Sequence, residues 1–154
     1  MRKILFTIAL STLVTVTCTL AQSTRHRVTL AFTTNQLGGD ISTFEILPSG
    51  EFKLDANGPF PVSTTPSSIA LSPTGRFAYV ANLREGTVAG FKVGRTGDLA
   101  RIAGSPWHSG HGTNFVAVDP SGRFVYATNC GNICSGPGDG DISAFSIEDR
   151  RAHV

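Results

Sequence analysis

The chain has 154 residues, 40% of them hydrophobic and 16% charged, with 13 basic against 11 acidic residues. This length allows one domain of modest size. The charges are nearly balanced and form no long basic run, which excludes nucleic acid and anionic membrane surfaces as partners recognised by charge.

The first 21 residues are predicted to be a secretory signal peptide. Arg2 and Lys3 precede an uncharged, largely apolar run from Ile4 to Val16, and the small residues Thr19 and Ala21 follow. This order predicts cleavage after Ala21 and a secreted or periplasmic protein without a membrane span. A transmembrane anchor is the alternative, but the apolar run is shorter than the ~20 residues that a spanning helix needs. Cleavage leaves 11 basic and 11 acidic residues, so the mature chain is formally neutral.

Cys18 raises a further alternative, in which the cysteine is acylated and becomes the first residue of a lipoprotein. The residues before it, Thr15-Val16-Thr17, lack the Leu and the small residue of a lipobox. Lipidation at Cys18 is therefore not predicted.

A repeat of 47 residues runs through the rest of the chain. The segment from Ser72 to Asn82 aligns without a gap on the segment from Asp119 to Asn129, and Pro59-Phe60 aligns on Pro106-Trp107. The register changes once, where seven extra residues fall within 130–141. A repeat of this length indicates that one structural unit recurs along the chain.

Each unit is predicted to contain four short antiparallel strands. In the best-preserved copy, these are Ser68–Leu71, Phe77–Ala81, Thr87–Val93 and Leu99–Ala103, separated by turns rich in Gly, Pro and Asn. Four strands with a period in the forties are typical of a β-propeller blade. The alternatives are a β-solenoid or two sandwich domains, but solenoid coils are shorter and sandwiches do not repeat in this way.

The fold class is therefore all-β, a β-propeller fragment of about two and a half four-stranded antiparallel blades. Residues 22–147 hold a partial blade at 28–62, a full blade at 67–107, and a partial blade at 115–147 with the insertion at 130–141. Residues 148–154 form an irregular tail. Seven such blades would need about 330 residues, so we expect a fragment or a truncated product. Self-association through open blade edges is the alternative.

The segment Ser68 to Asn82, Ser-Ile-Ala-Leu-Ser-Pro-Thr-Gly-Arg-Phe-Ala-Tyr-Val-Ala-Asn, resembles the YVTN-type blade of the lactonase seven-bladed propellers. That family includes 6-phosphogluconolactonase-like and carboxymuconate-cyclase-like proteins. The segment from Ala103 to Trp107 is similar to the segment that joins neighbouring blades in exported bacterial members of that family. The resemblance implies a lactonase-like hydrolase that acts on a sugar or organic-acid lactone and requires no cofactor. The alternative function is a non-catalytic propeller that binds a ligand or a protein at the cell envelope.

Candidate catalytic residues lie in the segment before the last unit. His108, His111 and Asn114 fall where a propeller chain enters an inner strand near the central channel, and histidine exchanges protons near neutral pH. Lactone hydrolysis needs an activated water and a polarised carbonyl, which His, Asn and a nearby Arg can supply. The alternative is that both histidines are solvated loop residues.

The insertion carries two further groups of reactive side chains. Cys130 and Cys134 are predicted to form a disulfide after export, with free thiols or a metal site as the alternatives. Asp139 and Asp141 are weak candidates for a calcium site, because two carboxylates fall short of the six to eight oxygens that calcium takes. Turn formation explains them with fewer assumptions.

Overall fold

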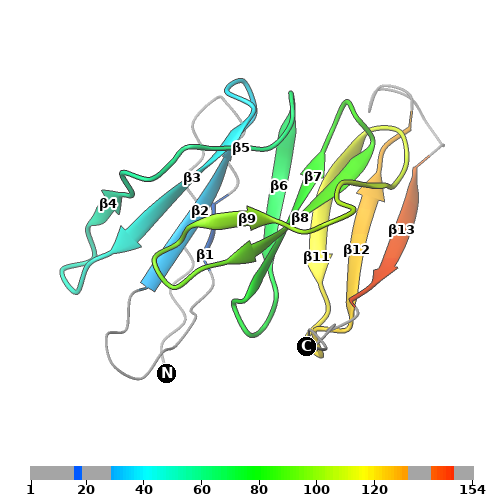
Figure 1. Cartoon of the computed structure of the whole chain (residues 1–154). Helices are drawn as coiled ribbons and strands as arrows, with labels where there is room; N and C mark the ends of the chain where they lie inside the picture. The colour runs from blue at the N-terminus through cyan, green and yellow to red at the C-terminus, as the bar shows by residue number, and fades with distance from the viewer. Residues whose placement is uncertain (1–15, 19–28, 132–139, 148–154) are drawn as a thin grey trace.

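The computed structural model describes residues 16–18, 29–131 and 140–147 (Figure 1). These residues form thirteen β-strands and no helix, which confirms the predicted all-β class. No helix in this described part is long and apolar enough to cross a membrane.

The strands form three antiparallel sheets, which we call the first, second and third blade. The first blade holds β1 (Val16–Cys18), β2 (Thr29–Asn35), β3 (Asp40–Ile46), β4 (Phe52–Leu54) and β5 (Phe60–Pro61). The second holds β6 (Pro66–Leu71), β7 (Phe77–Asn82), β8 (Thr87–Val93), β9 (Leu99–Arg101) and β10 (Trp107–His108). The third holds β11 (Thr113–Val118), β12 (Phe124–Asn129) and β13 (Asp141–Ser146). The blades stand side by side in chain order (Figure 1).

β1 lies within the segment predicted to be the leader. Its residues pair with β2, so that Val16 faces Thr33 and Cys18 faces Ala31. β1 thus holds the place beside β2 that β6 holds beside β7. Cleavage after Ala21 would remove β1, so export and this pairing are alternative uses of the same residues.

Two apolar clusters fill the spaces between neighbouring blades, which we call the first and second seam. In the first seam, Leu30, Phe32 and Ile41 of the first blade meet Ile69, Val80 and Phe91 of the second. In the second seam, Tyr79 and Val88 of the second blade meet Val116, Val125 and Ala127 of the third. Because side chains alternate along a strand, Val80 of β7 packs in the first seam and Tyr79 packs in the second. Burial at both seams is the main source of the blades' mutual attachment.

The third blade has one covered face and one open face within the described residues. Along β12, Val125 and Ala127 are buried, whereas Phe124 and Tyr126 are 36% and 41% exposed. Tyr79, the repeat equivalent of Tyr126, is only 5% exposed because the third blade covers it. Phe115, Phe124, Tyr126 and Ile142 form an apolar surface that we call the open face.

The turns that enter β7 and β12 have the same shape but different chemistry. In the second blade the Ser72 hydroxyl accepts a hydrogen bond from the Phe77 N–H (3.1 Å). In the third blade the Asp119 carboxylate takes that place and accepts the N–H groups of Arg123 and Phe124. The hydroxyl of Ser121, followed by these turn N–H groups, lowers the pKa of Asp119 to about 2. The turn before β12 therefore depends on an ionised carboxylate that acid can protonate, whereas the turn before β7 depends on a hydroxyl that does not titrate.

Candidate functional site

The structure places the three predicted catalytic residues on separate elements. His108 ends β10 and lies opposite Thr87 of β8. His111 follows in the loop 109–112, which we call the His111 loop, and Asn114 lies in β11. All three are exposed, and the only one with a side-chain hydrogen bond in the described part of the chain is Asn114, which accepts from the Thr128 hydroxyl (2.6 Å). They share a region but form no hydrogen-bonded triad.

Hydrogen bonds hold the backbone of the His111 loop to the β7–β8 turn on one side and to the residues after β12 on the other. The Ser109 N–H donates to the carbonyl of Gly86 in the β7–β8 turn (2.9 Å). On the other side, the Cys130 and Gly131 N–H groups donate to the carbonyls of Gly112 and His111 (both 3.0 Å). Hydrogen bonds therefore hold the backbone on both sides of His111, whereas its exposed imidazole makes no hydrogen bond within the described residues.

Two glycines allow the His111 loop to lie close to the β7–β8 turn and to the Asn129 side chain. A Cβ on Gly86 would lie 2.6 Å from the carbonyl oxygen of Gly110, and Gly86 has a φ of 62°. A Cβ on Gly110 would lie 2.6 Å from Nδ2 of Asn129. Any larger residue at either position would push the His111 loop away from its supports.

Asn129 is the side chain that holds this loop to the third blade. Its Oδ1 accepts hydrogen bonds from the hydroxyls of Ser109 (2.9 Å) and Thr113 (2.8 Å). Its Nδ2 donates to the Asp141 carboxylate and to the Ser143 hydroxyl (3.0 Å). Asn129 is 3% exposed, so these bonds satisfy a buried amide that would otherwise be costly.

The equivalent asparagines of the other two blades make related hydrogen bonds. Asn82 accepts from the Ser63 hydroxyl (2.7 Å) and donates to the Thr87 hydroxyl (2.9 Å). Asn35 donates to Asp40 and to Ser42 in the first blade. The sequence predicts that Asn belongs to turns, and the carbonyls of Asn35 and Asn82 do accept the N–H groups of Gly39 and Gly86 in the turns that follow. All three also end β-strands. The buried side chains of Asn82 and Asn129 join the loop before their blade to its third strand, whereas the half-buried Asn35 bonds to the third strand alone.

Glu85 is a second anchor at this edge of the blades, and the sequence did not single it out. It lies in the β7–β8 turn, and its carboxylate accepts hydrogen bonds from the Thr64 N–H (2.9 Å) and from the hydroxyls of Thr64 and Thr65. Burial alone would raise the pKa of Glu85, but the hydrogen bonds from Thr64 and Thr65 outweigh it and lower the pKa below 4.5. The carboxylate is therefore ionised at neutral pH.

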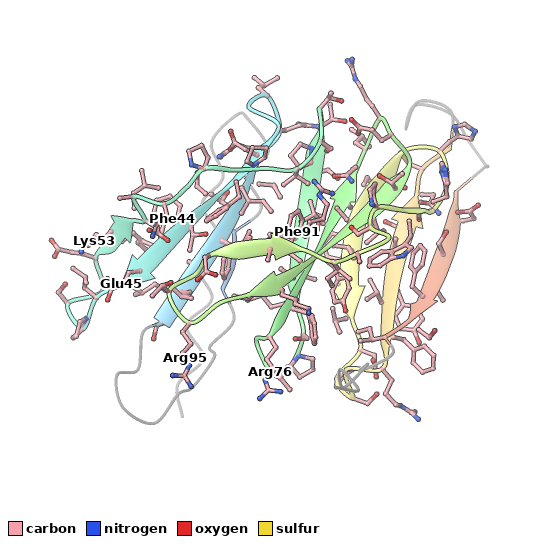
Figure 2. The ribbon with its side chains drawn as sticks, viewed as in Figure 1. Phe44, Glu45, Lys53, Arg76, Phe91 and Arg95 are labelled. Carbon is pink, nitrogen blue, oxygen red and sulfur yellow. The ribbon has the colours of Figure 1, made fainter. Side chains whose placement is uncertain are left out.

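The β7–β8 turn thus lies between the loop 62–65 and the His111 loop. It carries Arg84 and Glu85, both exposed, and Gly86 touches the backbone beside His111. One repeat earlier, these two charged positions hold Leu37 and Gly38, so the charges are particular to this turn. This difference between repeat copies is the sequence signal that could have indicated the β7–β8 turn as a candidate site, because a single functional site needs its residues in only one copy. The recurrent arginine Arg76 lies at the opposite edge, with Arg95 (Figure 2).

The predicted metal and disulfide residues are only partly described. Asp141 begins β13 and accepts from Asn129, while Asp139 and Cys134 lie outside the described residues. No group of three or more His, Cys, Asp or Glu side chains in the described ranges could hold a metal ion. Cys130 is disulfide-bonded, and its Sγ contacts the Gly112 carbonyl oxygen at 3.1 Å. Because a disulfide sulfur carries no hydrogen, this contact is not a hydrogen bond, and the pairing with Cys134 stays a prediction.

These features define a set of β-propeller blades with loops gathered at one edge. The family model for "Lactonase, 7-bladed beta-propeller" matches residues 11–132. The chain therefore belongs to the lactonase family of seven-bladed propellers, as its blade sequence predicts. The match begins within the predicted leader, at the residues that precede β1. None of the curated proteins matches the chain significantly.

Solved structures with similar blades carry different names. A candidate 6-phosphogluconolactonase from Bacteroides uniformis has a TM-score of 0.66 and 20% identity, over 79% of this chain and 35% of its own. Its counterpart from Bacteroides fragilis has a TM-score of 0.59 and 22% identity, over 65% and 28%. Kuenenia stuttgartiensis hydrazine synthase has a TM-score of 0.54 and 21% identity, over 65% and 26%. The chain thus spans about a third of these proteins or less, and at such identities the likeness concerns the fold alone.

Proposed function

We propose that the chain supplies blades to an exported, lactonase-like propeller that hydrolyses a lactone of a sugar or an organic acid. The observation that carries this proposal is the joint position of His111, Arg84 and Glu85 at the loop edge of blades that belong to the lactonase family. These side chains come from two loops whose backbones are bonded to each other through Ser109 and Gly86.

The proposed chemistry uses water as the nucleophile. The imidazole of His111 takes a proton from water as the oxygen bonds to the lactone carbonyl carbon. The guanidinium of Arg84 stabilises the negative charge that develops on the carbonyl oxygen. The ring carbon–oxygen bond then breaks, and the proton passes to the leaving alkoxide to give a hydroxy acid. Glu85 acts as a positioning residue, since its hydrogen bonds hold the β7–β8 turn against the loop 62–65.

The test is a hydrolysis assay on the purified chain with δ- and γ-lactones of sugar acids, followed by proton release. We expect hydrolysis above the buffer rate, and a 10²–10⁴-fold lower kcat/KM in His111→Gln, as for loss of a general base. His108→Gln measures the contribution of the second histidine. Lys53→Gln is the matched control, because Lys53 lies on β4 at the far outer edge (Figure 2). Equal rates in His111→Gln and Lys53→Gln would contradict the proposal.

A non-catalytic binding module is the second candidate. It is favoured by the exposure of both histidines and by the absence of a hydrogen bond to either side chain within the described residues. Saturable lactone binding without hydrolysis, detected by ligand NMR, would support this candidate over the enzyme.

Export has its own test. We propose that residues 1–21 are removed during secretion, and the intact mass of protein from the culture supernatant or periplasm measures this directly. A mass that retains Val16–Cys18 would contradict cleavage after Ala21 and would leave these residues available to form β1.

A further inference from the structure

The loop between β4 and β5 of the first blade contains an exposed asparagine followed by glycine. Asn57 is exposed, and Gly58 comes directly after it, in the loop 55–59 (Figure 1). No other asparagine in the chain is followed by glycine. The side-chain amide of an asparagine can be attacked by the backbone nitrogen of the next residue, and glycine hinders this attack least because it has no Cβ.

The backbone nitrogen of Gly58 is free to react. In the described part of the chain its N–H donates no hydrogen bond, and the pairing of β5 with β3 begins two residues later, at Phe60. A nitrogen without an acceptor can lose its proton and approach the neighbouring amide without first breaking a hydrogen bond. The nucleophile and the exposed side chain that it would attack are therefore both available.

The buried asparagines of the blades lack this availability. The N–H of Leu83, which follows Asn82, donates to the Thr65 carbonyl (2.9 Å), and the N–H after Asn129 donates to a carbonyl of the His111 loop (3.0 Å). Asn82 and Asn129 are also only 1% and 3% exposed, and their side chains are hydrogen-bonded. Attack at either residue would first have to break these bonds, so Asn57 differs from both in exposure, in the next residue and in the free nitrogen.

Asp55 restrains the side chain of Asn57. Its Oδ1 accepts hydrogen bonds from the backbone N–H and from Nδ2 of Asn57 (both 3.0 Å). A carboxylate that accepts from Nδ2 makes the amide nitrogen a poorer leaving group, because it adds electron density to that nitrogen. The negative charge of Asp55 also opposes the loss of a proton from the nearby N–H of Gly58. Both effects slow the attack.

We propose that Asn57 is a site of spontaneous deamidation, and that Asp55 is a positioning residue that slows the reaction. The Gly58 nitrogen loses its proton and bonds to Cγ of Asn57, and the Cγ–Nδ2 bond breaks as ammonia leaves. Water then adds to either carbonyl of the cyclic imide and breaks its bond to nitrogen, which gives aspartate or isoaspartate at position 57. Water is the only co-reactant, and the inference does not rest on the proposed lactonase activity.

Deamidation would loosen the outer part of the first blade. The new carboxylate has lost the Nδ2 donor and lies beside the carboxylate of Asp55, so the two like charges repel. Isoaspartate also lengthens the backbone just before Phe60, which pairs with Ile41 of β3. The ring of Phe60 lies close to Gly58, where an added Cβ would be 3.4 Å away. We therefore expect the deamidated chain to melt at a lower temperature than the unmodified chain.

Mass spectrometry of the incubated full chain measures the reaction. Trypsin releases residues 54–76, in which Asn57 is the only asparagine, and residues 77–84, in which Asn82 is the only asparagine. We expect the acid form of the first peptide to accumulate at least about tenfold faster than that of the second. The rate should rise with pH, because the attacking nitrogen must lose its proton, and chromatography should separate an isoaspartate product from the aspartate product.

Three variants test the parts of the mechanism. Gly58→Ala should slow deamidation at least about tenfold, because its Cβ hinders the attack. Asp55→Ala should speed the reaction about threefold, the factor expected for loss of an exposed hydrogen bond to a charged group. Glu51→Ala is the matched control, since it removes an exposed carboxylate at the other end of β4 and should leave the rate unchanged. A thermal melt before incubation establishes that each variant is folded.

Three outcomes would overturn the proposal. One is deamidation at Asn57 that is no faster than at Asn82, and another is an unchanged rate in folded Gly58→Ala. The third concerns Asp55, because a rate in Asp55→Ala no higher than that in Glu51→Ala would show that its carboxylate does not slow the reaction.

Discussion

Removal of the Asn129 side chain tests whether the buried asparagines hold the blades and their loops together. Asn129→Ala deletes the acceptor of the Ser109 hydroxyl and the donor to Asp141 and Ser143. Thr113 keeps a partner, because its hydroxyl also lies 2.8 Å from the Gly110 carbonyl.

The expected cost follows from these partners. A neutral hydrogen bond contributes about 1 kcal/mol net, and one to a charged group about 1.5–3 kcal/mol. Ser109 and Ser143 account for two neutral bonds, and the bond to Asp141 takes the lower value because that carboxylate is exposed. We therefore expect Asn129→Ala to lower the free energy of unfolding by about 3.5 kcal/mol, measured by urea denaturation with Trp107 emission and circular dichroism. The amide of Ser109 should also exchange with deuterium faster.

Asn35→Ala is the internal control, because Asn35 is less buried and donates only to Asp40 and Ser42. Its expected cost is about 2.5 kcal/mol by the same values, lower than that of Asn129→Ala by the one bond to Ser109. A loss in Asn129→Ala no larger than that in Asn35→Ala would refute the reasoning, since the additional partners of Asn129 would then contribute nothing.

A double-mutant cycle isolates the contact with Asp141. Asn129→Asp retains the acceptor for Ser109 but places a carboxylate beside Asp141, so it should be destabilised at pH 7. Asp141→Asn in that background should restore about 1–2 kcal/mol, the coupling expected between contacting groups. An additive double mutant would contradict the described contact.

Three further predictions concern the seam, acid stability and the open face. Gly97→Ala should lose about 1–2 kcal/mol more in urea unfolding than Gly104→Ala, since both have positive φ but only Gly97 faces side chains of the first blade; equal losses would refute the steric argument. Folding lowers the pKa of Asp119 from 3.8 to about 2, so its stabilising contribution is complete above pH 3.8 and is lost as the pH falls through about 2. Asp119→Ser, which copies Ser72, should flatten acid unfolding in that window, and an unchanged pH profile would contradict this assignment. Tyr126→Lys on the open face should reduce concentration-dependent association in sedimentation experiments; a wild-type chain that stays monomeric at all concentrations would contradict self-association through this face.

The blade type could be predicted because its signals are local. The Pro and Gly of the turn before Phe77, and the alternating apolar residues that follow, lie within a few positions of one another and recur at 47 residues. Strand pairing within a blade follows from such short connections, so class and family were correct from sequence. These repeated residues could not indicate which part of the chain forms a functional site, because each blade contains them.

The sequence by itself determined what repeats, and only the tertiary structure decided what the unrepeated residues do. Glu85 contacts Thr64 across 21 positions of sequence, and Asn129 joins Ser109 to Asp141, so neither role can be read from neighbouring residues. The cavity of about 720 Å³ at Trp107 likewise depends on two blades meeting, since Val88 comes from the second blade and Phe145 from the third. Local chemistry sets strands and turns, whereas contacts between loops and seams depend on how whole blades pack, and that packing is long-range.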